Sequence, residues 1–535
     1  MFTDVRFCEL GVHRVPWGST GSRRARAVPR PLGEPMTRTE QTNTVRDQVP
    51  ASLPPFARWP VFGLAGGLAV LLLITASRYG YIGDELYFRV IGGHLDWSFP
   101  DQPPLVPLLA GAMDSAFPGS ILALRLPAIL CTAAGVVVCA LLARELGGST
   151  KAQVLAAGAF LCSPFMVLFG RYLLTSTLDV TLSAVLTLLL VRWLRTRADR
   201  LLLFAALVCA VALQAKMMIV IVTAALIVAL AVCGPRALLT RRPLWIGAGI
   251  AALTAVPMLV WQAGHGWPQL RMGDVLDGAA EDKAFGSGPL GFFLDAAMMC
   301  GVAGTLLLGY GLVRIFRDRE RRFLAVAFGL LVALFAVLGW SGYYIAALFP
   351  VLWAAGAVGL EGVRERWASM VVWLTLVVSL VIQVVNLPVR PLADVVDSDF
   401  RFDVSATAGW PELVADVAED YQLLPARTRE RTAIVSGTYE LASAIDRYGP
   451  DHDLPRTYSP YLGLWYVATP PESAETVLHI GDPSPTLRAA FGSAEQVGST
   501  DNGLGVENSF QGLPVWVLSD RKTSWSQLWP QLRVP

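Results

Sequence analysis

The sequence predicts an α-helical polytopic membrane protein with about eleven transmembrane helices and a small C-terminal α/β domain on the far side of the membrane. Of its 535 residues, 54% are hydrophobic and only 16% are charged, whereas about 25% of the residues in soluble proteins are charged. The apolar residues also form long uninterrupted runs. A run of about 20 such residues can cross a bilayer as a helix, because a helix satisfies its own backbone polar groups.

The apolar runs define the expected helices and domains. They occupy approximately residues 60–77, 121–143, 152–168, 177–194, 201–215, 217–233, 243–262, 291–313, 323–340, 344–360 and 368–387. The boundary at Gln214–Met217 is the least sharply defined, because without a turn there two runs would form one overlong helix. We expect a disordered basic cytoplasmic tail at 1–58, a transmembrane domain at 59–388 and a soluble extracytoplasmic α/β domain at 389–535.

The charges of the loops predict the orientation. One alternating set of loops is rich in basic residues, at positions 144, 151, 192, 195, 197, 200, 236, 241, 242, 314, 317, 319, 321, 322, 364 and 366. Positively charged loops stay in the cytoplasm, so the N-terminus is expected there and the C-terminal domain outside. The basic residues are almost all arginines, which is typical of a GC-rich bacterial genome, so the membrane is expected to be a bacterial plasma membrane.

The region after residue 388 differs in composition from the apolar part. Helical patterns at 411–424 and 439–448 alternate with short apolar runs at 433–435, 477–480 and 515–518, as in a small α/β domain. The cysteines end at residue 300, so this domain contains neither a disulfide nor a cysteine-ligated metal. The net charge of +1 gives no indication of a nucleic-acid partner.

The first outside loop contains the most informative polar residues. Asp84 and Glu85 are adjacent in a stretch rich in aromatic residues and glycine, and the sequences HLDW and DQPP follow at 94–97 and 101–104. A charge at membrane depth costs about 2.5–3.5 kcal/mol and often marks a functional site. The alternative interpretation is that the two acids cap a short interfacial helix.

This loop resembles the first extracytoplasmic loop of the bacterial GT-C membrane glycosyltransferases. The resemblance is to the dolichyl-phosphate-mannose protein mannosyltransferase and aminoarabinose transferase type, glycosyltransferase families 39 and 83. Further similar segments follow in the same order, at Arg171–Asp179, Gln214–Lys216, Trp261–Pro268, Gly342–Pro350, Gly409–Leu413 and Asp446–Pro450. The resemblance extends over most of residues 60–465.

The resemblance implies a GT-C fold and the transfer of a sugar from a polyprenyl-phosphate carrier at the outer face of the membrane. It implies that an acid of the first loop activates or positions the acceptor, and Asp84 matches that position best. Glu85 would share or support this role. Asp179 matches a further acid of the family, although it could also be the N-cap of a helix.

Three more residues are candidates for binding the donor phosphate. Lys216 interrupts an apolar run, and its ammonium would stabilise the leaving phosphate, or it could instead reach the outer interface as a snorkelling side chain. Tyr343 and Tyr344 would bind the head group of the carrier. Many relatives carry a basic residue just before these tyrosines, whereas this chain has Trp340–Gly342 there, and Arg271 or Lys283 would have to compensate.

No cofactor is required by the resemblance, but a divalent metal is compatible with it. The aminoarabinose branch places a metal near a loop histidine and an acid, which here would pair His265 with Glu85 or Asp84. The alternative is that His265 is an ordinary hydrogen-bonded loop residue, since tetrahedral zinc needs more ligands. The tryptophans Trp97, Trp261 and Trp267 could line a sugar or prenyl groove, or form an interfacial aromatic belt.

The sequence therefore favours a glycosyltransferase that uses a lipid, glycan or protein of the cell envelope as acceptor. The main alternative is a transporter or flippase of a lipid-linked or polar solute, which would be expected to show two repeated halves. No repeat is evident, and the acids lie in loops. Arabinose, mannose, glucose and galactose are all compatible with the sequence, because pocket shape determines sugar specificity.

Overall fold

The computed structural model describes residues 53–272, 288–363, 366–394 and 402–534. Residues 1–52 of the expected N-terminal tail lie outside the described residues. Lys283 also lies outside them. The first helix, α1, begins at Arg58.

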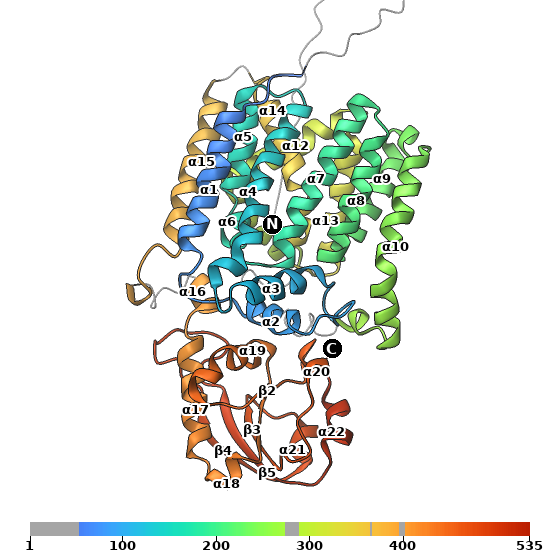
Figure 1. Ribbon diagram of the computed structural model, residues 1–535. Helices are drawn as coiled ribbons and strands as arrows, with labels where there is room; N and C mark the ends of the chain where they lie inside the picture. Colours follow the sequence, from blue (N-terminus) through green and yellow to red (C-terminus); the bar gives the residue numbers. More distant parts are fainter. Residues whose placement is uncertain (1–52, 273–287, 364–365, 395–401, 535) are drawn as a thin grey trace, which may run out of the picture. The chain divides into compact units, whose positions relative to one another are not determined.

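Long apolar helices form one part of the molecule (Figure 1). By length and composition, six stretches of the described residues could cross a membrane: α1 (Arg58–Thr75), α4 (Ile121–Glu145), α7 (Thr175–Thr196), α10 (Arg242–Gly264), α12 (Pro289–Arg317) and Gly342–Leu360, which combines η4 (Gly342–Leu348) and α14 (Phe349–Leu360). Further helices accompany them: α5 (Thr150–Leu161), α6 (Pro164–Leu168), α8 (Arg200–Ala215), α9 (Met218–Cys233), α13 (Arg322–Val337) and α15 (Arg366–Asn386).

Each of the predicted apolar runs coincides with helical structure. The turn expected near Gln214–Met217 is present, because α8 ends at Ala215 and α9 begins at Met218. The count of about eleven membrane crossings stays a prediction, since the described residues contain six helices that meet the length and hydropathy criteria.

The loops rich in arginine meet at one end of the helices. Glu145, at the end of α4, pairs with Arg192 at 3.0 Å and Arg195 at 2.8 Å, near the end of α7. Arg197 pairs with Glu320 in the connection between α12 and α13, at 3.3 Å. These pairs agree with the alternating pattern of loop charge, whereas the assignment of this end to the cytoplasm stays a prediction.

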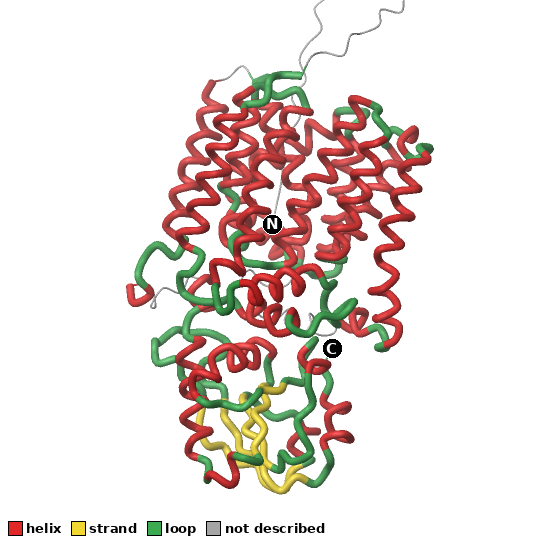
Figure 2. Tube along the Cα trace, viewed as in Figure 1, coloured by secondary structure: helices red, strands yellow, loops and turns green. Residues whose placement is uncertain are grey.

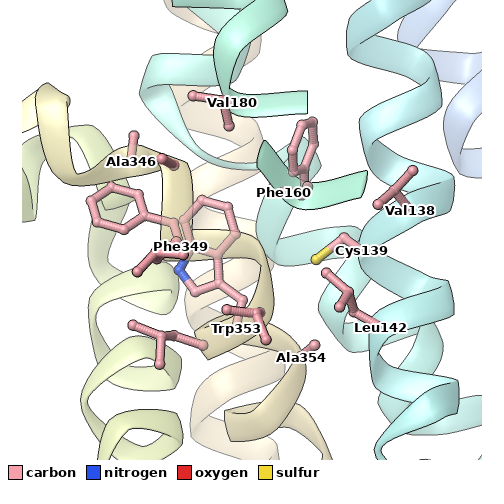
Figure 3. Close-up of a cluster of buried hydrophobic side chains, with 14 of the residues drawn as sticks. Val138, Cys139, Leu142, Phe160, Val180, Ala346, Phe349, Trp353 and Ala354 are labelled. Atoms are coloured by element: carbon pink, nitrogen blue, oxygen red, sulfur yellow. The ribbon is translucent and has the colours of Figure 1, made fainter. Parts of the chain in front are cut away.

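Close backbone contacts hold the helical core together. Side chains from α4, α5, α7 and α14 meet there (Figure 3), and the indole of Trp353 donates to the carbonyl of Gly304 at 3.0 Å. A Cβ atom at Gly311 would lie 2.0 Å from the carbonyl oxygen of Leu352, so only glycine permits this approach of α12 to α14. Small residues commonly serve this purpose between membrane helices, where dispersion contacts replace the hydrophobic effect.

The C-terminal region forms a five-stranded sheet with helices (Figure 2). The strands are β1 (Thr432–Ser436), β2 (Thr457–Tyr458), β3 (Thr476–Ile480), β4 (Phe491–Ser499) and β5 (Pro514–Arg521). Their order is β2-β1-β3-β5-β4, with β1 parallel to β2 and β3, and β5 antiparallel to β3 and β4. The helices are α16 (Phe402–Thr407), α17 (Trp410–Leu423), α18 (Ala426–Arg429), α19 (Tyr439–Tyr448), α20 (Leu464–Val467), α21 (Pro485–Ala489) and α22 (Trp525–Leu532).

A shared hydrophobic core joins this region to the loop that follows α1. Two short helices of that loop, α2 (Gly83–Gly92) and α3 (Leu105–Ala116), lie between the long helices and the sheet (Figure 1). Their buried residues form one cluster with those of α17 and α19. Within it, the indole of Trp410 donates to the carbonyl of Tyr81 at 2.9 Å. This continuity fixes α19 against the start of α2. The domain boundary at residue 388 stays a prediction.

Candidate functional site

The two adjacent acids at the start of α2 have different environments. Glu85 is completely buried, and its carboxylate pairs with Arg125 of α4 at 2.6 Å. It also accepts hydrogen bonds from the backbone N–H groups of Leu173, at 3.1 Å, and Ile82, at 3.2 Å. The second bond caps the helix, as one interpretation of the sequence expected. Because all of these donors occupy Glu85, its carboxylate holds α2 in place.

Asp84 is only partly buried, and one of its oxygens faces the C-terminal region. The hydroxyl of Tyr439, the first residue of α19, donates to Asp84 Oδ1 at 2.9 Å. Burial raises the pKa of Asp84 above the ordinary value of 3.8, and the charge of Glu85 adds to this effect, while the Tyr439 hydrogen bond and the charge of Lys216 oppose it. A carboxylate with a raised pKa is a stronger base than an ordinary one, which suits it to accept a proton.

A cavity of about 650 Å³ extends from Asp84 toward the long helices. We call it the donor cavity, after the role proposed for it below. Lys216, Tyr343 and Tyr344 line it together with Asp84. Its remaining lining residues include Tyr87, Phe88, Asp101, Gln102, Phe165, Phe169, Ser176, Met217, Trp340 and Tyr439. The structure thus brings four of the predicted site residues to one cavity.

Lys216 lies in the turn between α8 and α9, where the backbone is extended. Its ammonium donates to the hydroxyl of Ser176 at 2.7 Å. It also lies over the aromatic rings of Tyr343 and Tyr344, 5.3 Å and 5.1 Å from their centroids. Such cation–π contacts stabilise a cation that has lost water. The ammonium therefore points into the cavity, and this geometry does not match a side chain that reaches outward to the membrane surface.

Asp179 lies inside α7 near this cation. The helix begins at Thr175, so Asp179 is not its N-cap. Lys216 interacts electrostatically with both Asp179 and Asp84. Asp179 is 5% exposed, and its Oδ1 has no hydrogen-bond partner within the described residues. Lys216 is therefore coupled electrostatically to two acids.

The aromatic residues around η4 form a stacked group. The rings of Tyr343 and Tyr344 stack with centroids 4.2 Å apart, and Phe165 stacks on Tyr343 at 6.0 Å. Trp340, which stands where many relatives have a basic residue, contacts Tyr344 at 5.2 Å. Arg271 lies in the 3₁₀ helix η2 (Pro268–Arg271) and is exposed. It is not among the residues that line the donor cavity.

His265 lies at the end of α10, in a separate aromatic environment. Its ring stacks on Trp261 at 4.0 Å, and Nδ1 lies 2.7 Å from the carbonyl oxygen of Trp261. Within the described residues, no group of three or more His, Cys, Asp or Glu side chains could hold a metal. The contacts therefore agree with the alternative of a hydrogen-bonded loop histidine, and a metal shared with Glu85 stays an untested prediction.

The structure adds three residues that were not among the predicted site residues. Asp101 accepts a hydrogen bond from the hydroxyl of Tyr87 at 2.7 Å, and burial raises its pKa to about 7. The neighbouring Gln102 is 4% exposed, and its Nε2 has no hydrogen-bond partner among the described residues. Both line the donor cavity, as does Tyr439. The DQPP sequence was a signal for the first two, but nothing local distinguished Tyr439.

Comparison with known proteins gives the class of fold. Residues 101–261 match the family model described as dolichyl-phosphate-mannose-protein mannosyltransferase. The crystal structure of ArnT from Cupriavidus metallidurans in the apo state is similar, with a TM-score of 0.58 and 12% identity over 89% of this chain and 99% of that chain. The same protein bound to undecaprenyl phosphate has a TM-score of 0.58 and 13% identity, over 85% and 97% of the two chains.

A third similarity is to arabinofuranosyltransferase AftD from Mycobacteria, with a TM-score of 0.47 and 14% identity over 88% of this chain and 41% of that chain. A search of curated proteins found no match. The family match and the ArnT structures confirm the predicted resemblance: the chain has the fold of the GT-C membrane glycosyltransferases.

Proposed function

We propose that this protein is an integral membrane glycosyltransferase. It moves a pentose or hexose from a polyprenyl-phosphate carrier to a lipid, glycan or protein acceptor at the outer face of the membrane. The observation that carries this proposal is the donor cavity, where the carboxylate of Asp84 and the ammonium of Lys216 line one space. The undecaprenyl phosphate bound by ArnT from Cupriavidus metallidurans, which shares the fold, supports the choice of carrier.

The arrangement suits an inverting displacement. Asp84 removes the proton from an acceptor hydroxyl, and that oxygen attacks the anomeric carbon of the donor sugar. The bond from the anomeric carbon to the phosphate oxygen breaks, and polyprenyl phosphate leaves with the bonding electrons. Lys216 stabilises the negative charge of the leaving phosphate, with Tyr343 and Tyr344 beside it. Glu85 keeps Asp84 in position through its pair with Arg125.

The first test is sugar transfer by membranes that contain the protein. Radiolabelled polyprenyl-phosphate sugars would be offered as donors, with an envelope extract of the host as acceptor. Asp84→Asn keeps the shape of the side chain but removes the base, so transfer is expected to fall about 100-fold or more. Lys216→Ala is expected to reduce kcat about 100-fold, because the leaving group loses its cation.

The matched control is Asp482→Asn, an acid-to-amide change at an exposed residue of the C-terminal region. It should leave transfer unchanged. Absence of transfer from every donor, including the carriers of the host, would overturn the proposal and favour a transporter. Normal transfer by correctly folded Asp84→Asn protein would remove Asp84 from the mechanism.

A further inference from the structure

A second cavity, of about 630 Å³, adjoins Asp84 on the side of the C-terminal region. We propose that this acceptor cavity binds the acceptor, and that the acceptor is an uncharged glycan. The proposal rests on the glycosyltransferase function proposed above. The cavity is lined by Ile82, Gly83, Asp84, Ser405, Ala406, Trp410, Glu440, Glu507, Asn508, Ser509 and Phe510.

The position of Asp84 connects the two cavities. Among the described residues, it is the one that lines both. Two consecutive residues of α19 stand on either side of it, since Tyr439 lines the donor cavity and Glu440 lines the acceptor cavity. An acceptor hydroxyl that approaches from the second cavity would therefore meet the base directly, with the donor sugar on the opposite side.

Glu440 is held tightly against the start of α2. A Cβ atom at Gly83 would lie 2.5 Å from Cγ of Glu440, so the glycine is needed to admit this side chain. Burial raises the pKa of Glu440 to about 7, and the charge of Asp84 acts in the same direction. Near neutral pH, Glu440 can therefore accept a hydrogen bond from a sugar hydroxyl or donate one to it.

The charges of the acceptor cavity select against anionic acceptors. Asp84, Glu440 and Glu507 contribute carboxyl groups, and none of the described residues that line the cavity is basic. A phosphate or carboxylate on the acceptor would be repelled there. The donor cavity differs in this respect, because Lys216 lines it. The donor cavity is thus suited to the carrier phosphate, and the acceptor cavity is suited to uncharged hydroxyl groups.

The remaining lining residues suit a sugar ring. Trp410 and Phe510 lie with ring centroids 4.7 Å apart and give the cavity an apolar wall. Asn508 and Ser509 come from the same segment as Phe510 and provide amide and hydroxyl groups. An apolar wall with a few polar groups is typical of small-ligand sites, and a sugar presents both an apolar ring face and hydroxyl groups.

The test measures acceptor use by the full-length protein in membranes, with the donor identified as above. The probes are octyl glycosides of neutral mono- and disaccharides, and the same glycosides carrying one phosphate. The wild type should use neutral probes in preference to phosphorylated ones. Glu440→Gln and Phe510→Ala should each raise the KM for the neutral probe about tenfold, which corresponds to about 1.4 kcal/mol, with the KM for the donor unchanged.

Controls separate the two proposals. Glu507→Lys should improve use of the phosphorylated probe relative to the neutral one, whereas Glu495→Gln, at an exposed residue of β4, should change neither KM. Unchanged acceptor KM values in Glu440→Gln and Phe510→Ala would overturn the acceptor cavity while leaving the transferase proposal intact. Preference of the wild type for phosphorylated probes, or for a serine peptide, would overturn the uncharged glycan. Absence of transfer by the wild type would instead contradict the transferase proposal.

Discussion

At the scale of single residues, the two neighbouring acids of α2 differ because of what surrounds each. Glu85 is fully buried and paired with a guanidinium, whereas Asp84 faces cavities and is hydrogen-bonded by a single hydroxyl. The carboxylate of Glu85 is occupied by Arg125 and two backbone N–H groups, and Glu85 lines neither cavity. We therefore assign proton transfer to Asp84 and the supporting role to Glu85.

The pH dependence of transfer should report the pKa of Asp84. The base must be ionised, so kcat/KM is expected to rise with pH through a pKa that burial has raised above 3.8. Tyr439→Phe removes a hydrogen bond that lowers this pKa, so the rise should move to higher pH. The measurement is a pH profile of transfer for the wild type and Tyr439→Phe.

Other acids near the cavities could contribute to the same profile. Asp101 and Glu440 each have a pKa raised to about 7 by burial, and Lys216 and Glu85 act on Asp84 as charges. Profiles of Asp101→Asn and Glu440→Gln therefore serve as comparisons. A Tyr439→Phe profile that does not move, or that moves to lower pH, would contradict the assignment of the rise to Asp84.

At the scale of elements, the start of α2 depends on contacts with distant parts of the chain. Arg125 of α4 donates to the carboxylate of Glu85 and to the carbonyls of Ala76 and Gly80. These bonds join the end of α1, the start of α2 and the first turns of α4. The loop that carries Asp84 is thus fixed by a buried ion pair, and its geometry depends on both partners remaining charged.

Removing one partner of the Glu85–Arg125 ion pair should strongly destabilise the protein. Arg125→Met leaves the buried carboxylate of Glu85 without its partner, and we expect a loss of about 3–5 kcal/mol in the free energy of unfolding. The double variant Glu85→Gln with Arg125→Met should recover part of this loss, because no buried charge remains. Unfolding in mixed micelles with increasing dodecyl sulfate would measure both.

An exposed ion pair gives the matched control. Arg431 and Glu475 lie 2.6 Å apart with side chains 58% and 55% exposed, so Arg431→Met should cost no more than about 1 kcal/mol. Equal losses for the buried and the exposed variants would show that the Glu85–Arg125 pair does not stabilise the loop.

At the scale of the whole molecule, the described residues from 53 onward place the sheet and the arginine-rich loops at different ends of the helices. Ion pairs such as Glu145–Arg195 hold the arginine-rich loops together. At the other end, α19 contacts α2 through the hydrogen bond from Tyr439 to Asp84. The charge bias of the loops predicts that the arginine-rich end lies in the cytoplasm. Both proposed cavities would then lie at the outer face.

Cysteine labelling in intact cells tests this orientation. Ser526→Cys, in the C-terminal region, should react with a membrane-impermeant maleimide, whereas Arg319→Cys, between α12 and α13, should react only after the cells are permeabilised. The unmodified protein controls for its native cysteines, which are buried or partly buried within the described residues. The reverse labelling pattern would invert the topology and place Asp84 in the cytoplasm.

The sequence predicted the elements of this fold better than their contacts. Long apolar runs identified the helices, because the bilayer requires internally hydrogen-bonded segments. Short apolar runs identified β1 and β3, which are buried throughout, and β5, which is mostly half-buried. They did not identify β4, whose residues are mostly exposed. An exposed edge strand carries no apolar pattern, so its sequence gives little indication of a strand.

The candidate site was likewise predictable from the sequence only in part. The adjacent acids at Asp84 and the isolated Lys216 were visible as charges in an apolar setting, and the ordered motifs indicated the GT-C fold. Only the tertiary structure paired Glu85 with Arg125, placed Lys216 over two tyrosines, and brought Tyr439 and Glu440 to Asp84. The physical reason is sequence distance: contacts between residues 40 to 355 positions apart are decided by how buried surfaces pack, and no local pattern records them.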